Sequence, residues 1–130
     1  MKHSVMLAIA SLLSILFTTL HLADDIVRGF EKGGLSNLVA VPILVTWLYG
    51  ALVLAERRSG YVIVLLASLL GTWAPVIHFR AAGGVAGGEI PQSSGAFFWV
   101  WTLIALGVSS LFSAILSVQG LVTKQRGQAR

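Results

Sequence analysis

A histidine, two aspartates and an arginine interrupt the chain where its first long apolar run ends. They are His21, Asp24, Asp25 and Arg28. On a continuous helix, residues three, four or seven positions apart share one face. A carboxylate beside an imidazole orients the ring and raises its basicity, so such a pair can move protons near neutral pH. The spacing therefore predicts an acid–base pair made of His21 and either Asp24 or Asp25.

A second histidine, His78, closes a later apolar run. The runs that end at His21 and His78 are the first and third of the chain, so they cross an alternating bundle in the same direction and finish at similar depth. We therefore expect the two imidazoles to meet. Two histidines with a carboxylate also suit zinc or iron(II), and this predicts a metal site at His21, Asp25 and His78. Two histidines alone could instead ligate a haem.

The expected cluster faces a pocket that opens on one side of the membrane. Its candidate catalytic residues are His21, Asp24, Asp25 and His78. The residues expected to line the pocket around them are Arg28, Trp73, Arg80, Glu89, Trp99 and Trp101. A plainer interpretation stays open, in which these residues form a solvated helix end whose ion pairs add little stability. The sequence leaves the cofactor unknown.

The composition indicates a membrane protein. Of the 130 residues, 56% are hydrophobic and only 11% are charged, against about 25% charged in ordinary soluble domains. The chain has no cysteine, which excludes disulfides, cysteine-bound zinc and iron–sulfur clusters. Its net charge is +4, but the basic residues flank apolar runs and form no patch for nucleic acid. We therefore expect the protein to contact the lipid bilayer, and we do not expect it to bind nucleic acid.

Four uncharged runs predict four transmembrane helices. Each run has about 18 residues or more, the length that crosses a hydrocarbon core of about 30 Å. In lipid such segments must be helical, because their backbone groups have no water to bond. The helices are expected at about 4–32, 37–56, 60–80 and 95–122, with a loop at 81–95 and a tail at 123–130. The predicted fold is an all-α, antiparallel four-helix transmembrane bundle in a single domain.

Lysine and arginine counts predict the orientation. With the N-terminus inside, six basic residues lie on the inner side: Lys2, Arg57, Arg58, Lys124, Arg126 and Arg130. Three lie outside: Arg28, Lys32 and Arg80. Because cytoplasmic loops carry the excess of Lys and Arg, both termini are expected in the cytoplasm, most simply of a bacterium. We expect the first run to stay uncleaved, because His21 would occupy a cleavage-site position that needs a small residue.

Small residues recur every four positions on two of the expected helices. These residues are Ala10, Ser14 and Thr18 on the first helix, and Ala105, Ser109, Ser113 and Ser117 on the fourth. Such faces let helices approach closely in lipid, and they could also meet a membrane partner or a second copy. Two functions stay open. One is a non-enzymatic subunit or accessory protein, and the other is a membrane enzyme or small-molecule-binding protein that uses the His/Asp cluster.

Overall fold

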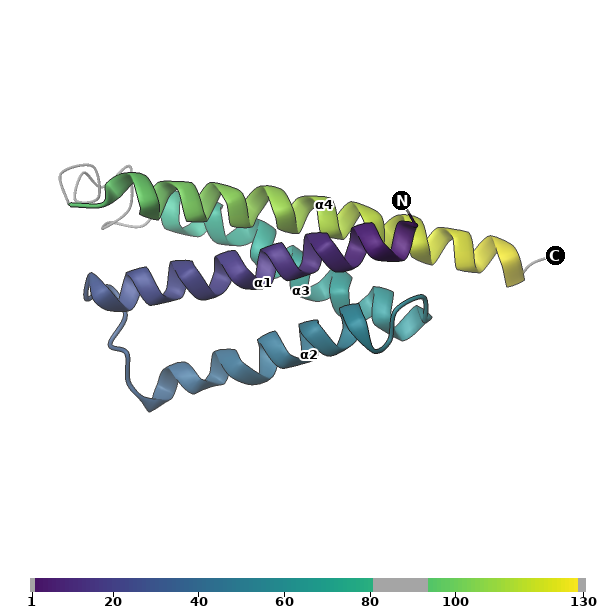
Figure 1. Cartoon of the computed structure of the whole chain (residues 1–130), viewed down its shortest axis with the longest axis horizontal. Helices are drawn as coiled ribbons and strands as arrows, with labels where there is room; N and C mark the ends of the chain where they lie inside the picture. The colour runs from purple at the N-terminus through teal and green to yellow at the C-terminus, as the bar shows by residue number, and fades with distance from the viewer. Residues whose placement is uncertain (1, 81–93, 129–130) are drawn as a thin grey trace.

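The computed structural model describes residues 2–80 and 94–128. The elements, in chain order, are α1 (His3–Val27), a short 3₁₀ helix η1 (Leu35–Val39), α2 (Ala40–Leu52), α3 (Arg58–Arg80) and α4 (Ala96–Gln128). Figure 1 shows both termini toward one end of the molecule, which we call the termini end. At the opposite end α1 and α3 finish and α4 begins; we call this the site end. The predicted all-helical fold is confirmed.

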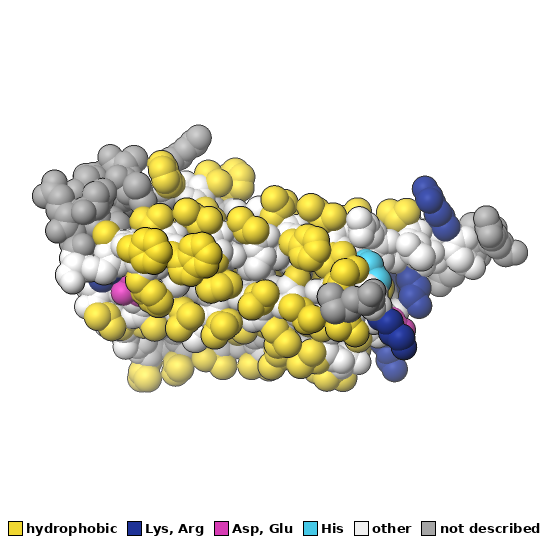
Figure 2. All heavy atoms as spheres, turned by 45° about the horizontal axis from the view of Figure 1, so that its top comes forward, with side chains coloured by type: hydrophobic (Ala, Val, Ile, Leu, Met, Phe, Trp, Pro, Cys, Tyr) yellow, Lys and Arg dark blue, Asp and Glu magenta, His cyan; other side chains and the backbone are white. Residues whose placement is uncertain are grey.

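Four segments are long and apolar enough to cross a membrane. They are His3–Val27, Leu35–Leu52, Arg58–Phe79 and Ala96–Gly127, the second of which joins η1 to α2. Figure 2 shows hydrophobic side chains over the body of the molecule, with Lys and Arg gathered toward the termini end. An apolar exterior of this kind suits lipid as solvent. The chain is therefore a multi-pass membrane protein.

The site end is built from α1, α3 and α4. Helix α4 packs against both α1 and α3, while α2 packs against α3 and α1. The buried residues of α2 are Trp47, Gly50 and Ala51, all in its second half. Figure 1 shows α2 diverging from α1 toward the site end. Side chains that meet at the site end therefore come from the other three helices.

Serine hydroxyls hold α1 against α4. The Oγ atoms of Ser11 and Ser113 lie 3.0 Å apart, and Ser14 donates to Ser109 over 3.1 Å. Ser11, Ser14 and Ser113 are fully buried. These small side chains face one another inside the chain, so they are already covered and a second copy would have to use other residues. Oligomerisation stays a prediction.

The serine contacts also decide which face of α1 turns inward. Seven residues rotate an α-helix by nearly two full turns, so His21 lies on the same face as Ser14. Both residues are buried. The face of α1 that carries the small residues therefore turns into the bundle and takes His21 with it.

Helix α1 ends at Val27, not near residue 32 as the sequence suggested. The cause is Gly29, whose φ of 77° lies in the left-handed region. The amides of Phe30 and Glu31 then turn back to the Asp25 carbonyl, over 2.9 and 3.2 Å. The expected end near residue 32 is therefore wrong, because a glycine at position 29 already ends the helix. Asp25 therefore lies in the last turn of α1.

Two other expected helix ends also differ. Helix α2 ends at Leu52 and not at residue 56, and Glu56 adopts a φ of 65° in the turn that follows. Helix α4 continues to Gln128, beyond the expected end at 122. Lys, Gln and Arg are good helix formers, so the polar tail extends the helix where the apolar run stops.

We expect the Gly60→Ala substitution to destabilise the protein. A Cβ at Gly60 would overlap the backbone carbonyl of Leu54, which cannot rotate away as a side chain could. Overpacking of this kind costs about 1–3 kcal/mol. Thermal unfolding in detergent micelles should show a lower midpoint. The Gly127→Ala variant, with nothing within 4 Å of the new Cβ, is the matched control; equal midpoints for both variants would contradict this packing.

Candidate functional site

Three helices bring five polar or aromatic side chains together at the site end. Helix α1 supplies His21 and Asp25, α3 supplies His78, and α4 supplies Trp99 and Thr102. The rings of His21 and His78 meet edge to face with centroids 5.0 Å apart. Trp99 lies 5.0 Å from His21 and 5.9 Å from His78, centroid to centroid. The expected convergence of the two imidazoles is therefore present.

A hydrogen bond from α4 orients the His21 ring. The Thr102 hydroxyl donates its single hydrogen to the Trp99 carbonyl over 3.1 Å. Its oxygen lies 3.2 Å from His21 Nδ1, so at this contact it can only accept. With the hydroxyl hydrogen assigned to the Trp99 carbonyl, the neutral ring carries its hydrogen on Nδ1 and leaves a lone pair on Nε2. That Nε2 is buried and has no hydrogen-bond partner.

A second hydrogen bond fixes the Asp25 carboxylate. The indole Nε1 of Trp99 donates to Asp25 Oδ1 over 2.6 Å. The side chains of His21 and Asp25 are only 5% and 6% exposed. Oδ1 is therefore engaged, and Oδ2 points toward the two imidazoles. The carboxylate is a buried member of the site and not part of a solvated helix end.

Three potential ligand atoms surround a common space. Asp25 Oδ2 lies 3.7 Å from His21 Nε2 and 3.9 Å from His78 Nδ1. One potential metal-ligand atom from each of the three residues lies within 4.8 Å of the other two. The separations exceed ordinary hydrogen-bond lengths of about 2.7–3.2 Å. Ligands that share a tetrahedral Zn²⁺ at about 2.0–2.2 Å lie roughly 3.3–3.6 Å apart, so a small inward movement would close the site on an ion.

The geometry suits a metal ion better than a haem. A haem between two histidines needs its macrocycle to pass between the rings. The edge-to-face contact of His21 and His78 leaves no such space. A compact ion needs only the three lone pairs, with Thr102 and Trp99 as the outer partners that orient His21 and Asp25.

No family model, curated protein or solved structure matches this chain.

The sequence could not choose between the two aspartates, and the structure separates them. Asp24 Oδ2 accepts a hydrogen bond from Arg28 Nε over 2.9 Å. This i, i+4 pair lies beside the cluster and keeps both charged groups out of its centre. Of the two carboxylates expected to pair with His21, only Asp25 does so.

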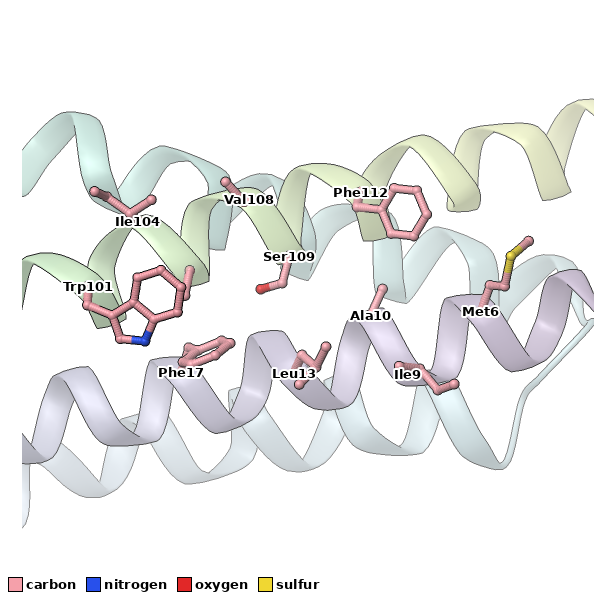
Figure 3. A pocket seen from close by; sticks show the side chains of 11 residues that line it. Met6, Ile9, Ala10, Leu13, Phe17, Trp101, Ile104, Val108, Ser109 and Phe112 are labelled. Atoms are coloured by element: carbon pink, nitrogen blue, oxygen red, sulfur yellow. The ribbon is translucent and has the colours of Figure 1, made fainter. Parts of the chain in front are cut away.

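Two of the expected tryptophan walls face elsewhere. Trp73 is 60% exposed on the lipid-facing side of α3. Trp101 is 52% exposed and lines an apolar groove of about 610 Å³ between α1 and α4. Figure 3 shows the Trp101 indole lying over Phe17 at one end of this groove. Trp99 is the only one of these three that touches the cluster.

Two expected pocket residues cannot be placed. Arg80 is the last residue of α3, and its side chain lies outside what the structure describes. Glu89 falls in the segment 81–93, which is also outside the described residues. Thr102 was missed by sequence reasoning, although it follows Trp99 by three residues and so shares its side of a helix.

Proposed function

We propose that this small multi-pass membrane protein binds one divalent transition-metal ion through His21 Nε2, Asp25 Oδ2 and His78 Nδ1. One observation carries the proposal: one potential ligand atom from each of His21, Asp25 and His78 converges on a common space, each within 4.8 Å of the other two. A divalent cation in this space would be attracted by the carboxylate and by one lone pair from each imidazole. Two histidines and one carboxylate are a ligand set typical of Zn²⁺ and Fe²⁺.

Acid–base catalysis by the same residues is less well supported. A shared proton would need His21 Nε2 and Asp25 Oδ2 at hydrogen-bond distance, and they lie 3.7 Å apart. Their orienting partners, Thr102 and Trp99, are the kind of outer contacts that metal ligands use. We therefore propose metal binding as the function, in a binding or accessory protein, and assign no reaction.

The charge pattern supports a location for the site. Six Lys and Arg residues flank the spans at the termini end in sequence, and three flank the other end. Because the positive side of a membrane protein stays in the cytoplasm, we propose that both termini are cytoplasmic and that the site lies near the opposite face of a bacterial cytoplasmic membrane. The ion would then exchange with the outer aqueous phase.

Cobalt titration tests the proposal. Protein in neutral detergent, stripped with a chelator, should bind one equivalent of Co²⁺ and acquire visible absorption. Zn²⁺ should displace the cobalt and abolish the colour, because it binds N/O sites more tightly and has a filled d shell. A His3→Ala variant is the control, since His3 begins α1 at the termini end and should leave the titration unchanged. Absence of saturable absorption in the unmodified protein would overturn the proposal.

A further inference from the structure

The proposed metal site supplies three protein ligands, which leaves its coordination incomplete. No other His, Asp or Glu within 2–80 and 94–128 joins the group formed by His21, Asp25 and His78. Asp24 is engaged by Arg28, and the Thr102 hydroxyl is held between His21 and the Trp99 carbonyl. Zn²⁺ takes four ligands and Fe²⁺ up to six. At least one position therefore awaits a ligand from outside these residues.

The charge of the site decides what kind of ligand fits. A divalent ion bound by one carboxylate and two neutral imidazoles leaves a net charge of about +1. The charge of the nearby Asp24 is already neutralised by Arg28, 2.9 Å away. A lone positive charge is costly in a buried site of low dielectric. An anionic ligand would remove that cost, as would a bound water that loses a proton to become hydroxide.

The route to the open position passes His78, Trp99 and Arg28. His78 is the exposed member of the group, with 35% of its side chain accessible. Next to it lies Trp99 in the first turn of α4, and the Trp99 backbone N–H donates to the Gly95 carbonyl over 3.3 Å. Arg28 reaches the same helix start, because its Nη2 lies 2.9 Å from the place a Cβ would occupy on Gly95. The guanidinium at the approach is paired with Asp24, and its Nη2 side faces the start of α4.

We infer that the bound metal takes a small oxyanion, with a carboxylate or phosphate oxygen, as its exogenous ligand. The inference rests on the proposed metal binding and names the substrate class of that site. A soluble anion and the phosphate of a lipid headgroup share this chemistry. A soluble anion or a lipid phosphate would each complete the coordination of the metal and neutralise the positive charge of the metal site.

Spectra of the cobalt-loaded protein test the inference. In neutral detergent, acetate and inorganic phosphate should each shift the visible bands of bound Co²⁺ in a saturable manner. In phosphatidylcholine nanodiscs, addition of phosphatidylglycerol should shift the bands only if a lipid headgroup is the ligand. A shift by either source supports the inference. Unshifted bands with cobalt bound in both settings would overturn it and leave metal binding intact, whereas failure to bind cobalt would overturn the proposed function itself.

Charge variants show whether the site itself selects the anion. The Arg28→Gln substitution leaves Asp24 uncompensated beside the entrance and should weaken anion affinity about tenfold. The Arg28→Lys variant should restore most of that affinity. Arg58→Gln removes the same charge from the start of α3, at the termini end, and should leave anion affinity unchanged. Equal weakening by the two glutamine variants would overturn the inference, because bulk charge would then explain the shift.

Discussion

Metal affinity is expected to fall more than about 100-fold in the Asp25→Asn variant, a larger loss than outer-contact changes cause. The amide keeps an oxygen that can accept from Trp99 Nε1, so the 2.6 Å hydrogen bond and the fold should survive. What disappears is the negative charge and the Oδ2 acceptor that faces the imidazoles. Competition between Co²⁺ and a calibrated chelator measures the loss.

Two companion variants separate binding from folding. Asp25→Ala also leaves the buried Trp99 N–H without an acceptor, which should lower the free energy of unfolding by about 1–3 kcal/mol. Asp24→Asn removes the neighbouring carboxylate, which contacts Arg28 and not the cluster, and should change metal affinity by less than about threefold. If both asparagine variants weakened cobalt binding alike, the carboxylate would act through general charge and the assigned ligand would be wrong.

Much of the fold follows from patterns that are local to the sequence. Apolar runs of membrane-spanning length predict helices, because lipid offers the backbone no other partner. The approach of His21 to His78 was also predictable, since two helices that run in the same direction end at similar depth. The inward rotation of α1 followed from Ser14, because small residues mark the faces along which helices pack.

The rest depended on rotations that the sequence does not determine. Asp24 and Asp25 differ by about 100° around α1, and only the placement of α4 decides which one enters the cluster. Trp99 and Trp101 differ by about 200° around α4. Trp99 is buried against the histidines, and Trp101 lines the exposed apolar groove. Thr102 contributes through a hydrogen bond between helices. Its role required the three-dimensional contact with His21.

The Thr102→Val substitution is expected to weaken metal binding about 10–100-fold, although Thr102 would not touch the ion. Valine keeps the shape of threonine but removes the oxygen that accepts the His21 Nδ1 hydrogen over 3.2 Å. Without that acceptor the ring can place its hydrogen on Nε2, and the lone pair then points away from the metal position. Cobalt affinity measured by chelator competition should fall while the number of sites stays at one.

A spectroscopic measurement distinguishes this positioning role from simple loss of packing. In the metal-free protein, ¹⁵N shifts of the His21 ring should report a hydrogen on Nδ1, and in Thr102→Val they should move toward the Nε2-protonated form. Thr102→Ser retains the hydroxyl and should restore both the tautomer and the affinity. Because serine lacks the methyl group that valine retains, rescue by serine assigns the effect to the hydrogen bond. Weak binding with an unchanged tautomer would show that Thr102 acts through packing alone.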